Sequence, residues 1–390
     1  MTNGGRDAVI VAAVRTPVGR GHREKGYYRD VHPADLLGRC FTEVVERAGM
    51  DPAEVDNVIA GCVYQTAEQS AGITRNAWLQ KGLPETAGAT TVDIRCGSGQ
   101  QAVNLAALRI SAGMDDVVVA GGVEHMGRVG FGVNDAAQQE WGNPFTEELL
   151  ERYELVPQGV GAEMIADRWE ISRAEMDAFA LRSHQLAHQA TAAGRFEREI
   201  LPTAVNGGDA HVTDQGIREN TTLDALAQLK PAFKEDGKVT AGNSSQISDG
   251  AAALLLMSRE KAVALGLEPR AKVGDQVVLG VDPVTMLTGP IPATEKILRR
   301  NGLAIGDLDI IEINEAFASV VLAWGREHDP DMDRVNPRGG AIALGHPLGS
   351  TGARLITTLL HELEDEDKEL GLVTMCCGGG LGTATLVQRV

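Results

Sequence analysis

Short runs of apolar, often β-branched residues alternate along the chain with stretches whose apolar positions recur every three or four residues. The runs DAVIVAAV, VDNVIAG, TTVDIRC and DDVVVAGG (7–14, 55–61, 90–96 and 115–122) predict strands, and the intervening stretches predict helices near 33–49, 70–81 and 98–113. The last part repeats the pattern with AKVGDQVVLG, LDIIEIN, RGGAIALGH and LGLVTMCC (271–280, 308–314, 338–346 and 370–377), and with helices near 291–301 and 315–328. This alternation indicates a layered α/β protein.

The two ends of the chain read as two copies of one unit. GMDPAEVDNVIAG (49–61) aligns without a gap to GLAIGDLDIIEIN (302–314), and DDVVVAGG then falls opposite LGLVTMCCG (370–378). Such self-similarity indicates a duplicated fold, and a more polar segment separates the copies. The predicted organisation is an N-terminal half of residues 1–122 plus 245–270, an inserted loop domain of 123–244 that covers the core, and a C-terminal half of 271–390.

Four chemically capable side chains follow strand-like runs. They are Cys96, Asn314, His346 and Cys376, and the alignment of the two copies sets Cys96 opposite His346. Ligands of layered α/β proteins usually bind where the carboxyl ends of strands converge. One shared site is therefore expected.

The motif CGSGQQA (96–102) places a thiol at a predicted strand-to-helix junction. It also matches the dinucleotide fingerprint, but Asp115 and Asp116 precede the next strand instead of closing it, which disfavours nucleotide binding. A buried structural cysteine is the plainer alternative. Unpaired N–H groups and the dipole at a helix N-terminus favour a thiolate, so the position predicts a lowered pKa and a nucleophilic Cys96.

Three further motifs carry the other candidates. GGAIALGHPLGSTGAR (339–354) sets His346 in a glycine-rich turn, from which an imidazole can accept the proton of a thiol. MCCGGGLG (375–382) offers a second thiol and consecutive backbone N–H groups, as an oxyanion hole requires. NEAFAS (314–319) places Asn314 where it orients a water or carbonyl, or caps a helix. A structural histidine and a tight structural turn are the alternatives for the first two motifs.

The net charge and the cysteine pattern limit the classes of binding partner and the cellular compartments that we expect. The formal net charge of −18 disfavours nucleic acid and anionic membranes as partners. The longest apolar runs are too short to cross a bilayer and no export signal precedes the first strand, so we expect a cytoplasmic protein. The five cysteines lack CxxC pairs, which predicts reduced thiols and no metal site. His184 and His188 in HQLAH are interpreted as one solvated helix face.

Taken together, CGSGQQA, NEAFAS, GGAIALGHPLGSTGAR and CCGGGLG resemble the thiolase family in order and spacing, over nearly the whole chain. The resemblance implies that Cys96 is the nucleophile that becomes acylated and that His346 activates it and helps to hold the thioester oxygen. It implies that Cys376 is the acid/base thiol and that Asn314 holds a water, which with His346 forms the oxyanion hole for the enolate. The N–H groups of Cys96 and Gly378 would form the second hole. Cys377 stands where the family usually has an aliphatic residue and is expected to be inert.

The same resemblance implies a CoA site. Arg218 would lie near the adenine, Phe233 and Ser245 along the pantetheine, and Ala316 with Phe317 in the pocket wall. The implied reaction is CoA-dependent thiolytic cleavage of a 3-ketoacyl-CoA, with CoA as co-substrate and neither a bound cofactor nor a metal. Members of the family are dimers or dimers of dimers, so a homo-oligomer is expected.

Three alternatives to degradative cleavage are weighed. Synthesis of acetoacetyl-CoA uses the same residues, a decarboxylating ketoacyl synthase would pair its cysteine with two histidines, and a non-catalytic acyl-CoA-binding protein would lack a reactive group. Short-chain biosynthetic thiolases carry a His-Met-Gly stretch where this chain reads PQGVGAE (157–163). That departure suggests an acyl pocket not restricted to acetoacetyl groups, and other stretches look most like actinobacterial degradative thiolases, some of which handle steroid side chains.

Overall fold

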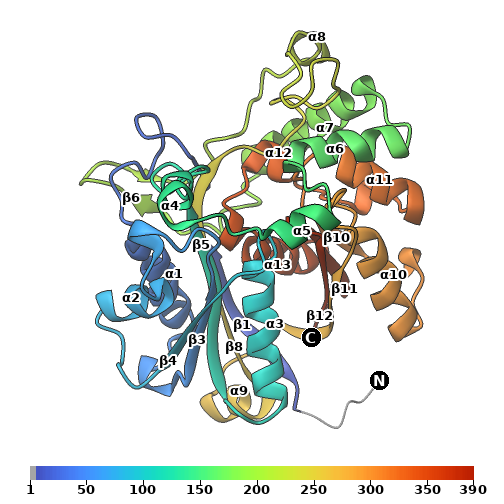
Figure 1. The fold of residues 1–390 in the computed structure, drawn as a ribbon. Coiled ribbons are helices and arrows are strands. Elements are labelled where there is room, and N and C mark those ends of the chain that lie inside the picture. The colour runs from blue at the N-terminus through green and yellow to red at the C-terminus, as the bar shows by residue number, and fades with distance from the viewer. Residues whose placement is uncertain (1–5) are drawn as a thin grey trace.

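The computed structural model describes residues 6–390, so the first five residues of the predicted N-terminal half lie outside the described residues (Figure 1). The N-terminal half contains strands β1 (Ala8–Arg15), β2 (Gly19–Arg20), β3 (Asn57–Gly61), β4 (Gly88–Val92), β5 (Val117–His125) and β8 (Ser248–Ser258), and helices α1 (Pro33–Ala48), α2 (Ile73–Gln80), α3 (Ser98–Ser111) and α9 (Arg259–Leu265). The C-terminal half contains strands β9 (Ala271–Gly280), β10 (Ile310–Ile313), β11 (Leu370–Cys377) and β12 (Leu381–Arg389), and helices α10 (Pro290–Asn301), α11 (Ala318–His328), α12 (Ala341–Leu344) and α13 (Leu348–Asp365).

Both halves contribute to one ten-stranded sheet, in the order β10-β11-β12-β9-β1-β8-β5-β3-β4, with β2 paired to β8. In the N-terminal half β3 runs parallel to β5, which pairs antiparallel with β8, and β8 pairs antiparallel with β1. The strands β10, β11, β12 and β9 repeat that order and those directions. Even β4, parallel to β3, has a counterpart, because Val335 forms a parallel bridge with Ile311 of β10. The duplicated α/β fold predicted from the sequence is confirmed.

Helices α3 and α13 lie between the two halves of the sheet and contact each other (Figure 1). Helix α3 contacts β3, β5 and β12, and α13 contacts β5 and β8 as well as β10 and β11. Residues Leu348–Leu363 of α13 are buried without interruption, as in a helix enclosed on all sides. The helices touch through backbone, because a Cβ on Gly99 would lie 2.7 Å from the carbonyl oxygen of Gly349. Their N-terminal ends, next to Cys96 and His346, are thereby held together.

The inserted segment forms a helical layer on the C-terminal half. It contains α4 (Asp135–Trp141), α5 (Glu147–Arg152), α6 (Gln158–Arg168), α7 (Arg173–Ala192), the short strands β6 (Thr203–Ala204) and β7 (Ala210–His211), and α8 (Leu223–Ala227). Helix α7 begins at a capping box of Ser172 and Glu175. Ile165 of α6 and Phe179 of α7 share a buried apolar cluster with Trp324 of α11, which fixes the layer over the sheet. The exact domain boundaries stay a prediction.

One predicted strand is wrong. In RGGAIALGH, residues Ala341–Leu344 form the short helix α12, which ends at Gly345 with a φ of 108°. The backbone N–H of Ile342 donates to the buried carboxylate of Glu315 at 3.1 Å, which holds this segment away from the sheet edge. Val335 takes the place at that edge instead. His346 therefore follows a helix and a glycine turn rather than a strand.

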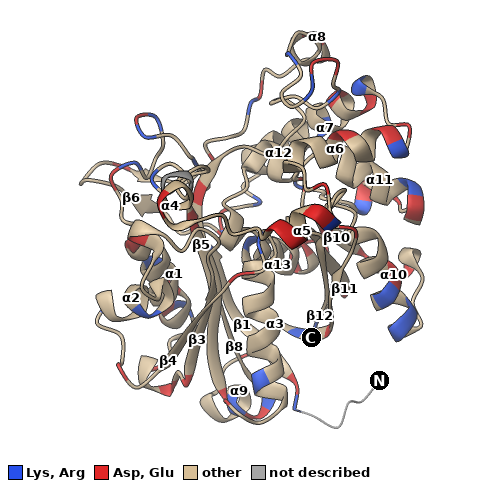
Figure 2. Ribbon diagram, viewed as in Figure 1, with Lys and Arg blue, Asp and Glu red and all other residues tan. Residues whose placement is uncertain are grey.

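The charged side chains have an uneven distribution (Figure 2). Helix α5 is acidic in its first turns, whereas the loop that follows β2 carries Arg23, Lys25 and Arg29. None of the helices in the described part of the chain combines the length and the apolar character needed to cross a membrane.

Candidate active site

Cys96 lies in a tight turn at the start of α3. Arg95 before it has a left-handed φ of 57°, which costs free energy in a residue with a Cβ. Two side chains hold that turn: Asp93 accepts from the Arg95 N–H at 2.7 Å, and Ser98 accepts from the Ile94 N–H at 3.0 Å. The Cys96 side chain is only 2% exposed. The chain therefore stabilises a strained turn that presents one thiol to the interior.

The electrostatics of Cys96 differ from the expectation. Burial raises the pKa of the thiol to about 11, and the N–H groups of Gly378 and of Cys96 itself, which donate towards the sulfur, oppose this shift. The predicted lowering of the pKa is thus wrong in sign, because desolvation of a thiolate outweighs the helix N-terminus. At neutral pH Cys96 is a thiol that needs a base to become a nucleophile.

His346 is held by three hydrogen bonds. Its backbone N–H donates to Ser248 Oγ at 3.1 Å, its Nδ1 lies 2.6 Å from Thr351 Oγ1, and its Nε2 lies 3.3 Å from Asn314 Nδ2. Thr351 Oγ1 donates to the carbonyl of Pro347 at 2.9 Å, so it accepts from Nδ1–H. The lone pair of the ring is then on Nε2, towards which Asn314 donates.

The surroundings of His346 keep the imidazole neutral. Burial, and then the positive charge of Arg354, lowers the pKa of His346 to about 3. Arg354 is itself buried and lies 3.4 Å from Glu312 of β10. A neutral ring whose lone pair is on Nε2 can accept a proton from a thiol. The structure thus brings His346 and Asn314 together, as the sequence predicts.

Cys376 and Cys377 end β11 and point to opposite sides of it, because successive side chains of a strand alternate. Cys376 belongs to the apolar cluster that contains Ala316 and Phe317. Cys377 belongs to the cluster that contains Cys96 and the core side of α3. Burial, and then the neighbouring Cys96, raises the pKa of Cys376 above its usual range. Cys376 therefore lies on the same side of β11 as Ala316 and Phe317, two of the predicted CoA-binding residues. It is also close enough to Cys96 for the charge of one thiolate to affect the pKa of the other.

Four of the predicted CoA-binding residues come together, and two of them, Ala316 and Phe317, share a buried apolar cluster with Cys376. Ser245 donates its N–H to the carbonyl of Ala316 at 2.9 Å. The ring of Phe317 meets that of Phe233 edge to face, with centroids 5.9 Å apart. Phe233 is 44% exposed, so this ring forms the outer end of the group. These residues form a wall that is exposed at Phe233 and buried at Ala316 and Phe317.

Arg218 lies further out on the same side. Its side chain is exposed and forms no ion pair with any residue that the structure describes. The loop that carries it is held by Gln246, which donates to the carbonyls of Gly216 and Ile342 at 3.0 and 2.9 Å. His184 accepts the backbone N–H of Arg218 at 3.2 Å. The interpretation of His184 as a solvated residue is wrong, since its side chain is buried, while His188 is exposed.

Two residues that support the site were missed. Thr351 positions His346, and Glu124 accepts hydrogen bonds from the N–H groups of Val63 at 2.9 Å, Tyr64 at 3.1 Å and Gly349 at 3.0 Å. Glu124 therefore ties the end of β5 to the first turn of α13. Neither role has a sequence signal beyond the presence of a polar residue near a motif.

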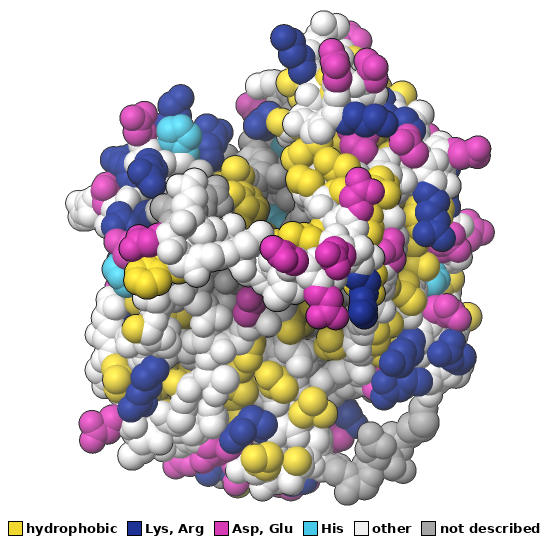
Figure 3. Space-filling view, in the orientation of Figure 1, with side chains coloured by type: hydrophobic (Ala, Val, Ile, Leu, Met, Phe, Trp, Pro, Cys, Tyr) yellow, Lys and Arg dark blue, Asp and Glu magenta, His cyan; other side chains and the backbone are white. Residues whose placement is uncertain are grey.

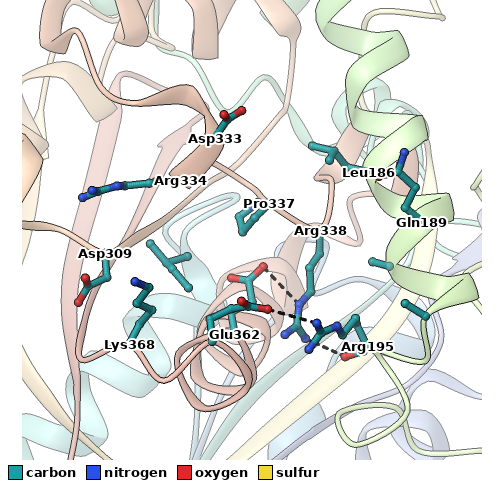
Figure 4. A pocket seen from close by; sticks show the side chains of 14 residues that line it. Leu186, Gln189, Arg195, Asp309, Asp333, Arg334, Pro337, Arg338, Glu362 and Lys368 are labelled. Carbon is teal, nitrogen blue, oxygen red and sulfur yellow. Dashed lines mark hydrogen bonds and ion pairs between the residues drawn. The ribbon is translucent and has the colours of Figure 1, made fainter.

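The surface in front of the site is hollowed. Figure 3 shows a depression between the segment that carries α4 and the part of the loop domain formed by α6 and α7, with hydrophobic side chains around it. A different pocket of about 470 Å³ lies at the C-terminal end of α13 and includes Arg338, Glu362 and Lys368 (Figure 4). None of the predicted site residues is among the described residues that line it, so it is separate from the thiol site.

Comparisons with known proteins find similar sequences and a similar structure. The family model "Thiolase, N-terminal domain" matches residues 8–260, and "Thiolase, C-terminal domain" matches residues 267–389. The chain is 45% identical over 401 residues to "Steroid 3-ketoacyl-CoA thiolase FadA6" of Mycobacterium tuberculosis, which covers 100% of this chain and 97% of the relative. It is 45% identical over 398 residues to a "3-ketoacyl-CoA thiolase" of Shewanella frigidimarina, covering 99% and 100%. The crystal structure of the Bacillus anthracis acetyl-CoA acetyltransferase superimposes with a TM-score of 0.91 at 40% identity, covering 100% of both chains.

Proposed function

Because the chain belongs to the thiolase family, we propose that it catalyses the CoA-dependent thiolytic cleavage of 3-ketoacyl-CoA to acetyl-CoA and a shortened acyl-CoA. The observation that carries the proposal is the assembly of the Cys96 thiol, the Gly378 N–H and the Cys376 thiol next to the exposed wall of Phe233. The names of two full-length relatives, both 3-ketoacyl-CoA thiolases, support it.

The first half-reaction acylates Cys96. His346 Nε2 takes the Cys96 proton, and the thiolate adds to C3 of the substrate while the C3 oxygen gains negative charge. The N–H groups of Cys96 and Gly378 would stabilise that oxygen. The carbonyl then re-forms as the C2–C3 bond breaks, and the electron pair of that bond becomes the enolate of acetyl-CoA. Asn314, through a water, and His346 would stabilise the enolate oxygen, and the thiol of Cys376 gives its proton to the enolate carbon.

The second half-reaction releases the shortened acyl group. Cys376, now a thiolate, takes the proton of an incoming CoA thiol, and the CoA sulfur attacks the acyl carbon on Cys96. The Cys96 sulfur leaves and recovers its proton from His346. Two thiols are needed because one is covalently occupied while the other moves a proton. Fixed N–H donors meet each negative charge, so we propose that CoA is a co-substrate and that no resident cofactor or metal is involved.

The substrate range and the setting are finer proposals. We propose that the acyl pocket accepts groups bulkier than acetoacetyl, including steroid side chains. The name of the mycobacterial relative and the PQGVGAE stretch at 157–163 support this proposal. We also propose a cytoplasmic homo-oligomer, a dimer or dimer of dimers, that has no nucleic-acid or membrane partner. The edge strand β4 offers a row of backbone groups that a second copy could pair.

The test is a cleavage assay with purified full-length protein. Acetoacetyl-CoA, a medium-chain 3-ketoacyl-CoA and a steroid-side-chain 3-ketoacyl-CoA are each mixed with CoA, and loss of the substrate absorbance is followed. Mass spectrometry of the protein without CoA should show an acyl adduct on Cys96. Absence of cleavage for every substrate would refute the proposal. Exclusive turnover of acetoacetyl-CoA would favour acetoacetyl-CoA synthesis, the second candidate, which the name of the similar Bacillus structure supports.

A further inference from the structure

Gln158 presents a primary amide to the thiol site. It is the first residue of α6, and its side chain is half-buried. A Cβ built on Gly378 would lie 2.5 Å from Gln158 Nε2, so the amide nitrogen occupies the space directly over that glycine. The amide forms no hydrogen bond with any residue in the described part of the chain. Because the side chain is only partly buried, its amide is free to form a hydrogen bond with a ligand atom that enters the site.

The position of the amide relative to Cys96 identifies that ligand atom. The N–H of Gly378 donates towards Cys96 Sγ, so Gly378 and the amide above it border the space next to the sulfur. An oxygen on a carbon bonded to Sγ can reach this space. The Nε2 end of the amide faces it, and Nε2 can only donate, so the partner is an acceptor. Gln158 also begins a helix, where the dipole favours negative charge.

We propose that Gln158 is a further catalytic residue, whose Nε2–H donates a hydrogen bond to the C3 oxygen of the substrate as Cys96 adds to it. The inference rests on the proposed cleavage of 3-ketoacyl-CoA. In this step the Sγ–C3 bond forms and the π electrons of the carbonyl move onto oxygen. That negative charge is shared among the N–H groups of Cys96 and Gly378 and the amide of Gln158. When the carbonyl re-forms and the C2–C3 bond breaks, the same three donors remain on the thioester oxygen.

The proposal predicts that the role of Gln158 is independent of the acyl chain. Every 3-ketoacyl-CoA has the same oxygen on C3, so loss of the donor should slow all substrates by a similar factor. A glutamine that instead contacted a polar group further along the acyl chain would matter only for substrates that carry such a group. The two roles therefore separate in a comparison of substrates.

The experiment compares Gln158→Met, which keeps the side-chain length but removes the donor, with Gln158→Glu, which keeps the shape and offers only acceptors at neutral pH. Gln276→Met is the matched control, because Gln276 is also half-buried but lies on β9 opposite Thr385. Single-turnover acylation of Cys96 and kcat/KM are measured with acetoacetyl-CoA and with a long unbranched 3-ketoacyl-CoA. We expect both Gln158 variants to lose about 10- to 100-fold in acylation rate on both substrates, with an unchanged KM for CoA.

Four results would overturn the inference. Acylation at the wild-type rate in a folded Gln158→Met protein would do so and leave the cleavage activity standing. A loss on only one of the two substrates would place the amide on the acyl chain and not on C3. If Gln158→Met does not fold, Gln158→Glu decides, because wild-type rates in that variant are incompatible with a required donor. Wild-type protein that cleaves no substrate would refute the proposed function together with this inference.

Discussion

Gly97 lies between the turn that carries Cys96 and the side chain of Cys377. How closely Gly97 packs against Cys377 can be tested by a double-mutant cycle. Gly97 has a φ of −79°, so its backbone conformation suits alanine. The added Cβ would lie 2.8 Å from Cys377 Sγ and 3.0 Å from Thr383 Cγ2. Overpacking of this kind costs about 1–3 kcal/mol of stability. Replacing Cys377 by alanine removes the nearer contact, so the double variant should show a favourable coupling of about 1 kcal/mol or more.

The cycle is measured as denaturant midpoints of wild type, Gly97→Ala, Cys377→Ala and the double variant at one protein concentration. Gly306→Ala is the control, because a Cβ on Gly306 meets no atom within 4 Å. We expect Gly97→Ala to unfold at lower denaturant than wild type and the double variant to recover part of the loss. Strict additivity would refute the reasoning, since Cys377 Sγ would then not face Gly97. It would also remove the structural ground for placing Cys377 outside the reaction.

Three further predictions concern the reacting groups. With a pKa of about 11, Cys96 should be alkylated by iodoacetamide at a rate that rises about tenfold per pH unit from pH 7 to 10. Mass spectrometry measures the rate, and an alkylation rate that stops rising below pH 8 would contradict the prediction. Cys376→Ala should lower the cleavage rate by about 100-fold or more while Cys377→Ala stays active, and the reverse pattern would mean that the motif is shifted by one residue. Thr351→Val should lower kcat by about tenfold because the buried Nδ1–H of His346 loses its acceptor, and Thr351→Ser should restore it; a change in stability alone would argue against a positioning role.

The duplicated fold could be predicted because its signal is local and repeated. A gapless match between 49–61 and 302–314 requires the same strand and turn in both halves, and β3 and β10 occupy equivalent places in the sheet. The secondary structure of the segment that contains His346 cannot be predicted in this way. Its apolar residues satisfy the pattern of a strand, but the carboxylate of Glu315 binds the N–H of Ile342 and turns the backbone into α12. Tertiary hydrogen bonds of this kind leave no trace in periodicity.

The pKa values and hydrogen bonds of the site are likewise only partly predictable from the sequence. A helix N-terminus and neighbouring N–H groups can be expected for Cys96 from its motif, but the burial that raises its pKa depends on how completely α3 is enclosed. The partners of His346 likewise depend on the turn from Pro347 to Thr351. Gln158 could be noted from the sequence only as a departure from a family pattern. Its place over Gly378 follows from the packing of α6, which joins segments more than 200 residues apart.

The backbone contact between Gly99 and Gly349 has a consequence for how this protein is made. Cys96 comes from the N-terminal half, whereas His346, Asn314 and Cys376 come from the C-terminal half, so Cys96 has no base until the two helices meet. A nascent chain that has completed only its first half holds an ordinary thiol without a base. Activation of Cys96 therefore requires that the C-terminal half has been made and has packed against the first half.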